Sequence, residues 1–210
     1  MKKDVDIIVV LDRSGSMQSI KNETISGFNS FVSEQKKLDY RSSLTLVQFD
    51  DRYQIDYESV DINKVPELNT DTFVPRGLTA LLDAIGKTIK TTRDRYSKLV
   101  KNDLPGKTIF VIITDGQENN STKYNRKRIF KKIRKMEKEH NWEFVFLGAN
   151  QDAISEANNY GINAKRAMTY AADKVGTTDM FFSLSANIEE SLENGGEFEF
   201  TNEQRDKQKR

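Results

Sequence analysis

Two stretches of the chain, 5–11 and 108–113, each contain an unbroken run of five apolar residues, at 7–11 and 109–113. A strand with one face in water usually alternates apolar and polar positions. Continuous, largely β-branched runs of this length indicate strands that are buried on both faces. The two stretches therefore predict a sheet that is covered by helices on each side.

Helical and extended segments alternate along the rest of the chain. Apolar positions at helical spacing predict helices, and short β-branched or aromatic segments predict strands. The predicted helices are 18–38, 80–96, 123–139, 151–159 and a closing helix with Phe181, Leu184, Ile188 and Leu192 on one face; the further strands are 43–49, 53–57, 142–147 and 166–170. Because only the three residues 50–52, which include Asp50 and Asp51, separate 43–49 from 53–57, these two strands are expected to form a hairpin. The order predicts an α/β fold: a doubly wound, mostly parallel sheet with helices on both faces and one antiparallel edge strand.

Residues 1–194 are expected to form a single domain, and residues 195–210 a charged C-terminal tail. The turn at 194–196 (Asn-Gly-Gly) separates the two, and no long periodic pattern follows it. We expect this tail to be frayed, although Phe198 and Phe200 alternate with Glu and would suit a short edge strand.

Composition narrows the chemistry. The 33 Lys and Arg nearly balance the 32 Asp and Glu, for a net charge of +1, which argues against a globally basic nucleic-acid binder. The 210 residues include no Cys, so disulfides, thiolate metal sites and a Cys nucleophile are excluded. A single histidine, His140, makes a multi-His zinc site and a Ser-His-Asp triad implausible. Apolar runs of five residues do not span a bilayer, and acids interrupt the N-terminal segment, so we expect a cytoplasmic protein without membrane contact.

Hydroxyl and carboxylate side chains follow the predicted strands at one edge. Asp12, Ser14 and Ser16 form Asp-x-Ser-x-Ser directly after the first buried strand, and Asp115 follows the second in Thr-Asp-Gly. Thr79 stands at the entrance of the helix predicted at 80–96. Because ligands of open α/β sheets bind outside the carboxyl ends of the strands, we expect these five side chains to meet.

Their chemistry is that of a site for a hard divalent cation. Mg²⁺ prefers oxygen ligands and keeps several waters, and Ser and Thr hydroxyls leave its charge poorly compensated. Carboxylates can hold its waters without neutralising it directly. Such an ion attracts a carboxylate from outside, which makes the site a binding device.

At these residues the sequence resembles the von Willebrand factor A domain family and its metal-ion-dependent adhesion site (MIDAS). The resemblance covers about residues 4–193 and includes Thr79 in Gly-x-Thr-Ala-Leu. It implies that Ser14 and Ser16 coordinate Mg²⁺ directly, with Mn²⁺ or Ca²⁺ as alternatives, and that Thr79 does so in the ligand-competent state. It further implies that Asp12 and Asp115 act directly or through water, that a partner protein supplies a Glu or Asp, and that the strands 5–11 and 108–114 are neighbours. Among its members the chain looks most like the stand-alone intracellular proteins of bacteria and phages, such as the tellurium-resistance type.

Each residue of this set also has a structural interpretation. The serines and Thr79 are good helix N-caps, and Asp115–Gly116 suits an ordinary turn. Two neighbouring acidic positions are left out of the predicted site: Asp50–Asp51 as the hairpin turn, and Asp83 as an exposed acid in the first turn of its helix.

A strongly basic helix is the remaining feature. Residues 123–138 contain nine Lys and Arg and one acid, Glu137, for a charge of +8, so the rest of the chain carries −7. A solvated helix face and a docking surface for an acidic protein or a phosphate backbone both fit this run. The aromatic residues of this run do not support base recognition, so an acidic protein is the partner we expect for this helix, and nucleic acid is not.

The function predicted from the sequence is a divalent-metal-dependent protein-binding module that is not an enzyme. The alternatives are a metal-dependent hydrolase of the phosphatase kind and nucleic-acid binding through the basic helix. Against the hydrolase, Ser14 stands where phosphatases of the dehalogenase type place a second Asp.

Overall fold

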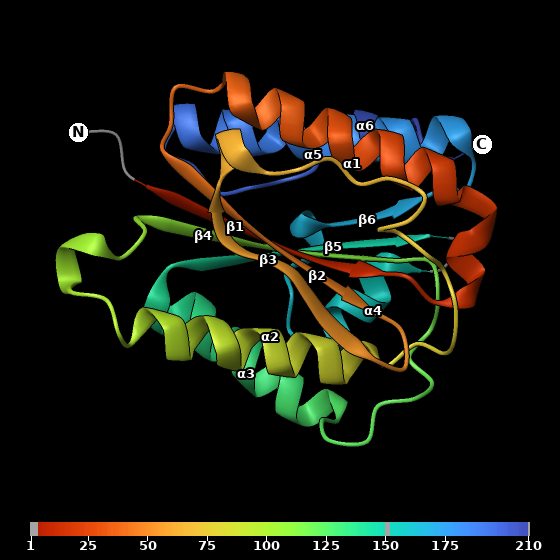
Figure 1. Ribbon diagram of the computed structural model, residues 1–210, viewed down its shortest axis with the longest axis horizontal. Helices are drawn as coiled ribbons and strands as arrows, with labels where there is room; N and C mark the ends of the chain where they lie inside the picture. The colour runs from red at the N-terminus through yellow and green to blue at the C-terminus, as the bar shows by residue number, and fades with distance from the viewer. Residues whose placement is uncertain (1–3, 150–151, 210) are drawn as a thin grey trace.

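The computed structural model describes residues 4–149 and 152–209, which form a six-stranded sheet between two layers of helices (Figure 1). The strands are β1 (Val5–Asp12), β2 (Ser42–Phe49), β3 (Tyr53–Asp61), β4 (Lys107–Thr114), β5 (Trp142–Ala149) and β6 (Ala167–Tyr170). The helices are α1 (Lys21–Lys37), α2 (Leu81–Tyr96), α3 (Arg126–His140), α4 (Ala153–Asn159), α5 (Lys174–Glu193) and α6 (Asn202–Asp206). Short 3₁₀ turns accompany them: η1 (Gly15–Ile20), η2 (Ile62–Lys64), η3 (Lys101–Asp103) and η4 (Ala164–Arg166).

The predicted fold class is confirmed. The strand order is β3-β2-β1-β4-β5-β6, and every neighbouring pair is parallel except the antiparallel pair of β2 with the edge strand β3. Helices α1, α5 and α6 cover one face, and α2, α3 and α4 cover the other (Figure 1). The order reverses at β1, so the connections out of β1 and β4 leave opposite sides and open a crevice at their carboxyl ends.

Burial on both faces explains the continuous apolar runs. In β1, Ile7 and Val9 point into the layer of α1 and α5, whereas Ile8 and Val10 point into the layer of α2 and α3. All four are fully buried or nearly so. The same alternation holds in β4, because each of these strands lies inside the sheet and neither face meets water.

The predicted elements form with shifted ends. The helix expected at 18–38 begins as η1 and becomes α1 only at Lys21, and the hairpin strand expected at 53–57 extends to Asp61. The first residue of the helix predicted at 151–159 lies outside the described residues, and α4 begins at Ala153. Within the described residues, no helix has the length and apolar character that crossing a membrane requires.

The expectation of a frayed tail is wrong for residues 197–208. Phe198 is fully buried and Phe200 is 4% exposed, and their rings meet edge to face at 4.9 Å. The Phe200 N–H donates to the Lys165 carbonyl (2.8 Å), and the Arg205 guanidinium donates to the carbonyls of Phe200 and Ala164. The two phenylalanines therefore anchor the segment in the core, but residues 197–200 adopt no strand.

Candidate metal centre

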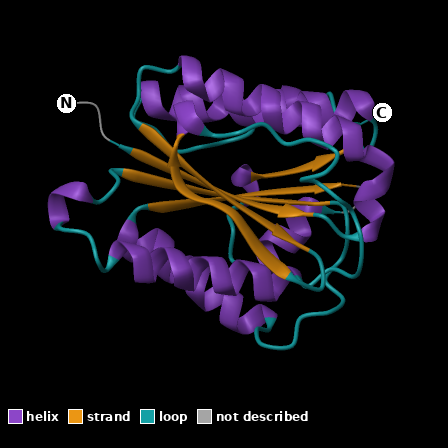
Figure 2. Ribbon diagram, in the orientation of Figure 1, coloured by secondary structure: helices purple, strands orange, loops and turns teal. Residues whose placement is uncertain are grey.

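The centre lies where β1 and β4 end, at the edge of the sheet where most connecting loops gather (Figure 2). The Asp12 side chain closes β1 and is completely buried. Its Oδ1 accepts the Ser14 backbone N–H (2.6 Å), and its Oδ2 accepts the Thr114 hydroxyl from the end of β4 (2.6 Å). Asp12 is thus fixed between its own loop and the neighbouring strand.

The two serines and Asp115 form a short hydrogen-bonded chain beside it. Ser14 Oγ and Ser16 Oγ are 3.1 Å apart, and the Ser16 hydroxyl donates to Asp115 Oδ1 at 2.6 Å. Ser14 occupies the N-cap position of η1, yet its side chain makes no capping hydrogen bond. Its hydroxyl is therefore turned toward the cluster instead of toward the helix.

Thr79 joins the same cluster from the loop that precedes α2. A Cβ atom built on Gly116 would lie 2.9 Å from Thr79 Oγ1 and 3.6 Å from both Asp12 Oδ2 and Ser14 Oγ. These three oxygens therefore surround one point, and any side chain at Gly116 would enter their space. The structure brings all five predicted residues together, from three separate loops.

The carboxylates of the cluster favour the presence of a cation. Burial raises the pKa of Asp12 to about 7, although the hydrogen bonds from Thr114 and Ser14 lower it, and the nearby Asp115 raises it further. Burial also raises the pKa of Asp115, against the hydrogen bond from Ser16. A divalent ion would compensate both charges. The donors are hydroxyl and carboxylate oxygens only, which suit Mg²⁺, Mn²⁺ or Ca²⁺.

The hydroxyls are essential to this fit. Among the described residues, no group of three or more His, Asp or Glu side chains is arranged to hold a metal ion. With two carboxylates, a site at Asp12 and Asp115 depends on Ser14, Ser16 and Thr79 for its remaining protein oxygens. The resemblance stated above implies the same role for these three hydroxyls, as neutral ligands of the metal.

Asp50 is not part of the predicted site, but in the structure it lies among the loops that carry the site residues. It is fully buried at the end of β2, and its Oδ2 lies 3.0 Å from both Arg13 Nε and Arg76 Nε. Its Oδ1 accepts the Arg52 N–H (2.5 Å), and its carbonyl accepts the Ala80 N–H (3.0 Å). Asp50 lies in the hairpin turn, as predicted, but it also pairs with Arg13 and Arg76, which the sequence interpretation did not include. The sequence signal for Asp50 is its position, since like Asp12 and Asp115 it directly follows a buried strand.

Backbone hydrogen bonds bring the Thr79 loop to the Asp12 loop. The Arg76 N–H donates to the Arg13 carbonyl (2.8 Å), and the Gly15 N–H donates to the Gly77 carbonyl (3.2 Å). Gly77 has a φ of +69°, and a Cβ there would meet the Asp51 carboxylate, so this turn requires glycine. The approach of the two loops is therefore built into the backbone.

The loop after β4 fixes Thr79 and the start of α2 from the other side. Asn119 Oδ1 accepts the Thr79 N–H (2.9 Å), and the Asn119 N–H donates to the Thr79 carbonyl (3.1 Å). Glu118 accepts the Leu82 N–H at the first turn of α2 (2.8 Å). The sequence contained no motif that would have identified Asn119 or Glu118, because their partners lie about 40 positions away.

Asp83 also differs from its prediction. Its side chain is half-buried and accepts the backbone N–H groups of Thr122, Lys123 and Tyr124, at 2.7–3.2 Å. Asp83 therefore fastens the loop before α3 to α2 and is not a freely solvated acid. Both ends of the loop that carries Gly116 are tied to α2.

The chain matches the family model of the von Willebrand factor type A domain over residues 6–183. No curated protein matches it. Among solved structures, it is similar to the vWF domain of the type V pili tip protein Mfa5 from Porphyromonas gingivalis, with 11% identity, a TM-score of 0.63, and coverage of 97% of this chain and 99% of that one.

Two further structures are metal-loaded. One is proximal thread matrix protein 1 from the mussel byssus, with a zinc-occupied MIDAS motif: 18% identity, a TM-score of 0.57, and coverage of 92% of this chain and 46% of that one. The other is the manganese-loaded TRAP protein of Plasmodium vivax, with 19% identity, a TM-score of 0.51, and coverage of 70% and 57%.

The chain spans slightly less than half the length of the mussel structure, and at these identities the likeness concerns the fold. The family model covers most of the sequence, from β1 into α5, and includes the three loops of the candidate centre. The chain therefore belongs to the von Willebrand factor type A domain family.

Proposed function

We propose that the chain is a divalent-metal-dependent protein-binding module, in which Mg²⁺ at an intact MIDAS captures a carboxylate of a partner protein. The observation that carries the proposal is the meeting of Asp12, Ser14, Ser16, Thr79 and Asp115 around a point that only a glycine leaves open. VWA domains act mostly as adhesion or interaction modules, which supports a binding role.

In this proposal the hydroxyls and the carboxylates have different tasks. Ser14, Ser16 and Thr79 would supply neutral oxygens to the metal, while Asp12 and Asp115 would hold it directly or through water. The bound ion would act as a Lewis acid that retains a net positive charge and attracts an anionic ligand. Ser16 is exposed and Asp115 is only half-buried, so a Glu or Asp side chain of a partner has access from this edge.

The metal-binding part of the proposal is tested by thermal unfolding in Mg²⁺ and in EDTA, with Mn²⁺ and Ca²⁺ tested alongside. Mg²⁺ is expected to raise the melting temperature of the wild type and to leave that of Asp12→Ala unchanged. Ser16→Ala removes one exposed hydroxyl and is expected to weaken the Mg²⁺ response without unfolding the chain. Asp71→Ala, an exposed acid in another loop, is the matched control. Identical wild-type melting in Mg²⁺ and EDTA would refute the metal site.

The partner is tested by capture on the immobilised chain in Mg²⁺ and in EDTA. A protein retained by the wild type in Mg²⁺, lost in EDTA and lost with Asp12→Ala would support carboxylate capture. Amidation or Glu→Gln substitution of its contacting acid is expected to abolish retention. Retention that persists in EDTA would contradict it.

A phosphatase-like activity is not favoured by the geometry. Phosphatases of the dehalogenase type place a second Asp two residues after the aspartyl nucleophile, whereas here that residue is Ser14, whose hydroxyl lies 3.1 Å from Ser16 Oγ. The proposal therefore treats the chain as a non-enzyme. Mg²⁺-dependent hydrolysis of p-nitrophenyl phosphate that disappears in Asp12→Asn would contradict this.

We further propose that the protein is of bacterial or phage origin, is tellurium-resistance-like, and works in the cytoplasm. Fractionation of cells that express a tagged chain would test the location.

A further inference from the structure

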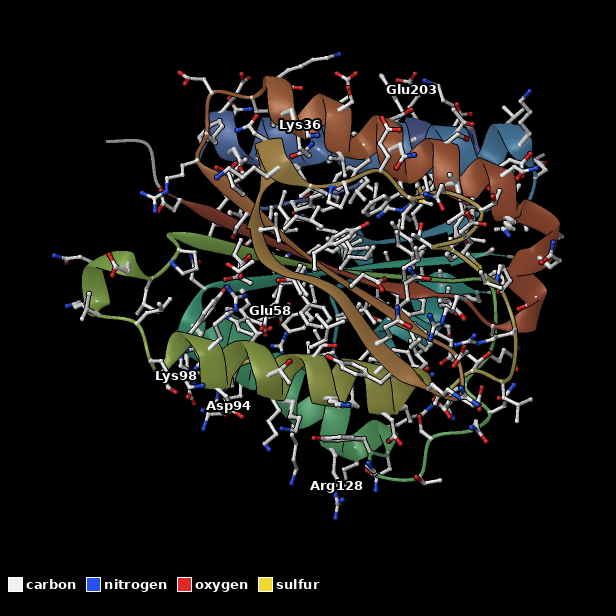
Figure 3. All side chains as sticks on the ribbon, viewed as in Figure 1. Lys36, Glu58, Asp94, Lys98, Arg128 and Glu203 are labelled. Atoms are coloured by element: carbon white, nitrogen blue, oxygen red, sulfur yellow. The ribbon has the colours of Figure 1, made fainter. Side chains whose placement is uncertain are left out.

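The two helical layers of the molecule carry opposite charge. Helices α2 and α3 together contain twelve Lys and Arg against four Asp and Glu. Helices α1, α5 and α6, on the other face of the sheet, contain five against eight. In Figure 3, Arg128 and Glu203 point away from these opposite layers. The near-zero net charge of the chain therefore conceals a basic face on α2 and α3.

The cations of this face come from two helices that lie side by side. The Tyr124 ring, just before α3, packs against Gly86 of α2, and Lys132 Nζ lies 5.6 Å from the centre of that ring. Lys132 of α3 shares its surroundings with Lys90 and Arg93 of α2. Burial and then the charges of Arg93 and Lys90 lower the pKa of Lys132. Like charges are therefore crowded where the two helices meet.

These charges are poorly compensated by the protein itself. Across residues 4–149 and 152–209, no ion pair with a carboxylate involves Arg93, Lys127, Lys131 or Lys132. Lys90 has only a 4.0 Å contact with Asp94, in which both side chains are more than 60% exposed. Exposed pairs of this kind contribute little and leave the cation free to bind elsewhere.

We infer that the α2–α3 face binds the phosphate backbone of a double-stranded nucleic acid, without reading its sequence. Lysines are depleted from the cores of protein–protein interfaces, which are richer in aromatic and apolar side chains. Protein–nucleic acid interfaces are instead polar and strongly positive. The face is made largely of exposed Lys and Arg, and the two aromatic side chains among them lie against other parts of the protein, Tyr124 against Gly86 and the 43% exposed Phe130 beside Gly161. Both features favour a duplex backbone over an acidic protein.

The length of α3 can be compared with the spacing of phosphates along a DNA duplex. With 15 residues, α3 is about 22 Å long, and a DNA duplex carries about one charge per 1.7 Å of its axis. About 13 phosphates therefore lie along the helix, and about half of them face one side of the duplex. The uncompensated cations on the two helices are similar in number. About six phosphate contacts predict a slope near −5 for the logarithm of affinity against the logarithm of salt concentration.

The test is fluorescence anisotropy with a labelled 20-base-pair DNA duplex between 50 and 200 mM NaCl. EDTA is present throughout, so that the result does not depend on the proposed metal function. We expect affinity to fall by roughly a thousandfold over this range and to be the same for two unrelated duplex sequences. The variant Lys90→Gln/Arg93→Gln/Lys131→Gln is expected to reduce the slope by about 3.

The matched control is Lys37→Gln/Lys174→Gln/Lys207→Gln, which removes three exposed charges from the opposite layer. It is expected to keep the wild-type slope, and both variants are expected to keep the wild-type melting temperature. Equal loss in the two variants would overturn the assignment to this face. Absence of duplex binding at 50 mM NaCl would overturn the proposal, and binding of poly-glutamate in its place would point to an acidic protein.

Discussion

Replacing Asp12 with Asn should stabilise the metal-free chain, although it removes a residue at the centre of the site. Asp12 is completely buried, and burial raises the pKa of its carboxyl from 3.8 to about 7. The charged form is therefore unfavourable in the folded chain without metal. The amide introduced by Asp12→Asn would keep an oxygen for the Ser14 N–H, and the Thr114 hydroxyl has a second acceptor in the Gly116 carbonyl at 3.0 Å.

The magnitude follows from the two pKa values. A carboxyl with a raised pKa contributes stability that is fully present below its unfolded pKa and is lost as the pH rises through its folded pKa. For Asp12 this window runs from about pH 4 to about pH 7. At pH 8 the loss corresponds to about 4 kcal/mol, and at pH 5 to less than about 2 kcal/mol. Asn does not ionise, so we expect Asp12→Asn to unfold with a free energy about 2–4 kcal/mol higher at pH 8.

The assay is urea unfolding of both chains in EDTA at pH 8 and pH 5. The gain at pH 8 should exceed the gain at pH 5. Asp71→Asn, which removes an exposed carboxylate, should change stability by about 0.5 kcal/mol or less at either pH. If Asp12→Asn were no more stable than the wild type at pH 8 in EDTA, the reasoning from burial would be refuted.

Three other substitutions test different parts of the structure. Asp50→Asn should lower the free energy of unfolding by about 3 kcal/mol, because it leaves the buried Arg13 without its anion. It should also weaken the Mg²⁺-dependent shift in melting temperature. A Mg²⁺ shift equal to that of the wild type would show that Asp50 does not position the site. Gly116→Ala should reduce Mg²⁺ affinity about tenfold or more by calorimetry, since its methyl group would contact Thr79 Oγ1, and unchanged affinity would mean that the ion lies elsewhere. Phe198→Ala should cost about 3–5 kcal/mol in urea unfolding, whereas a cost near zero would return this segment to the status of a loose tail.

The sheet could be predicted because its signals are local. The unbroken runs in β1 and β4 identify strands buried on both faces, and the turn at Asp50–Asp51 identifies the hairpin. The residues of the candidate centre could be predicted as well, since Asp12 and Asp115 each follow such a strand and parallel strands end at the same edge.

The supporting contacts could not be predicted, because they depend on packing between distant segments. Asp50 is a hub only because Arg13 and Arg76 reach it from two other loops, 37 and 26 positions away. Asn119 fixes Thr79 across 40 positions. The burial of Phe198 likewise depends on space left beside the sheet. Charge and alternation in the C-terminal segment were compatible with either a packed segment or a loose tail.

The buried charge of Asp12 lowers the stability of the chain without metal, and bound Mg²⁺ has to offset that loss. A ligand that binds only the folded state stabilises it by RT ln(1 + [L]/Kd), about 4.1 kcal/mol when its concentration is 1,000 times Kd. That is similar to the destabilisation of about 4 kcal/mol that burial of the Asp12 charge implies at pH 8. The wild type should therefore have a higher free energy of unfolding than Asp12→Asn only when the Mg²⁺ concentration is near 1,000 times Kd or above. If the free energies of unfolding of the wild type and of Asp12→Asn cross as the Mg²⁺ concentration is raised, the buried charge acts in metal binding, because Asn would give the more stable packing without metal.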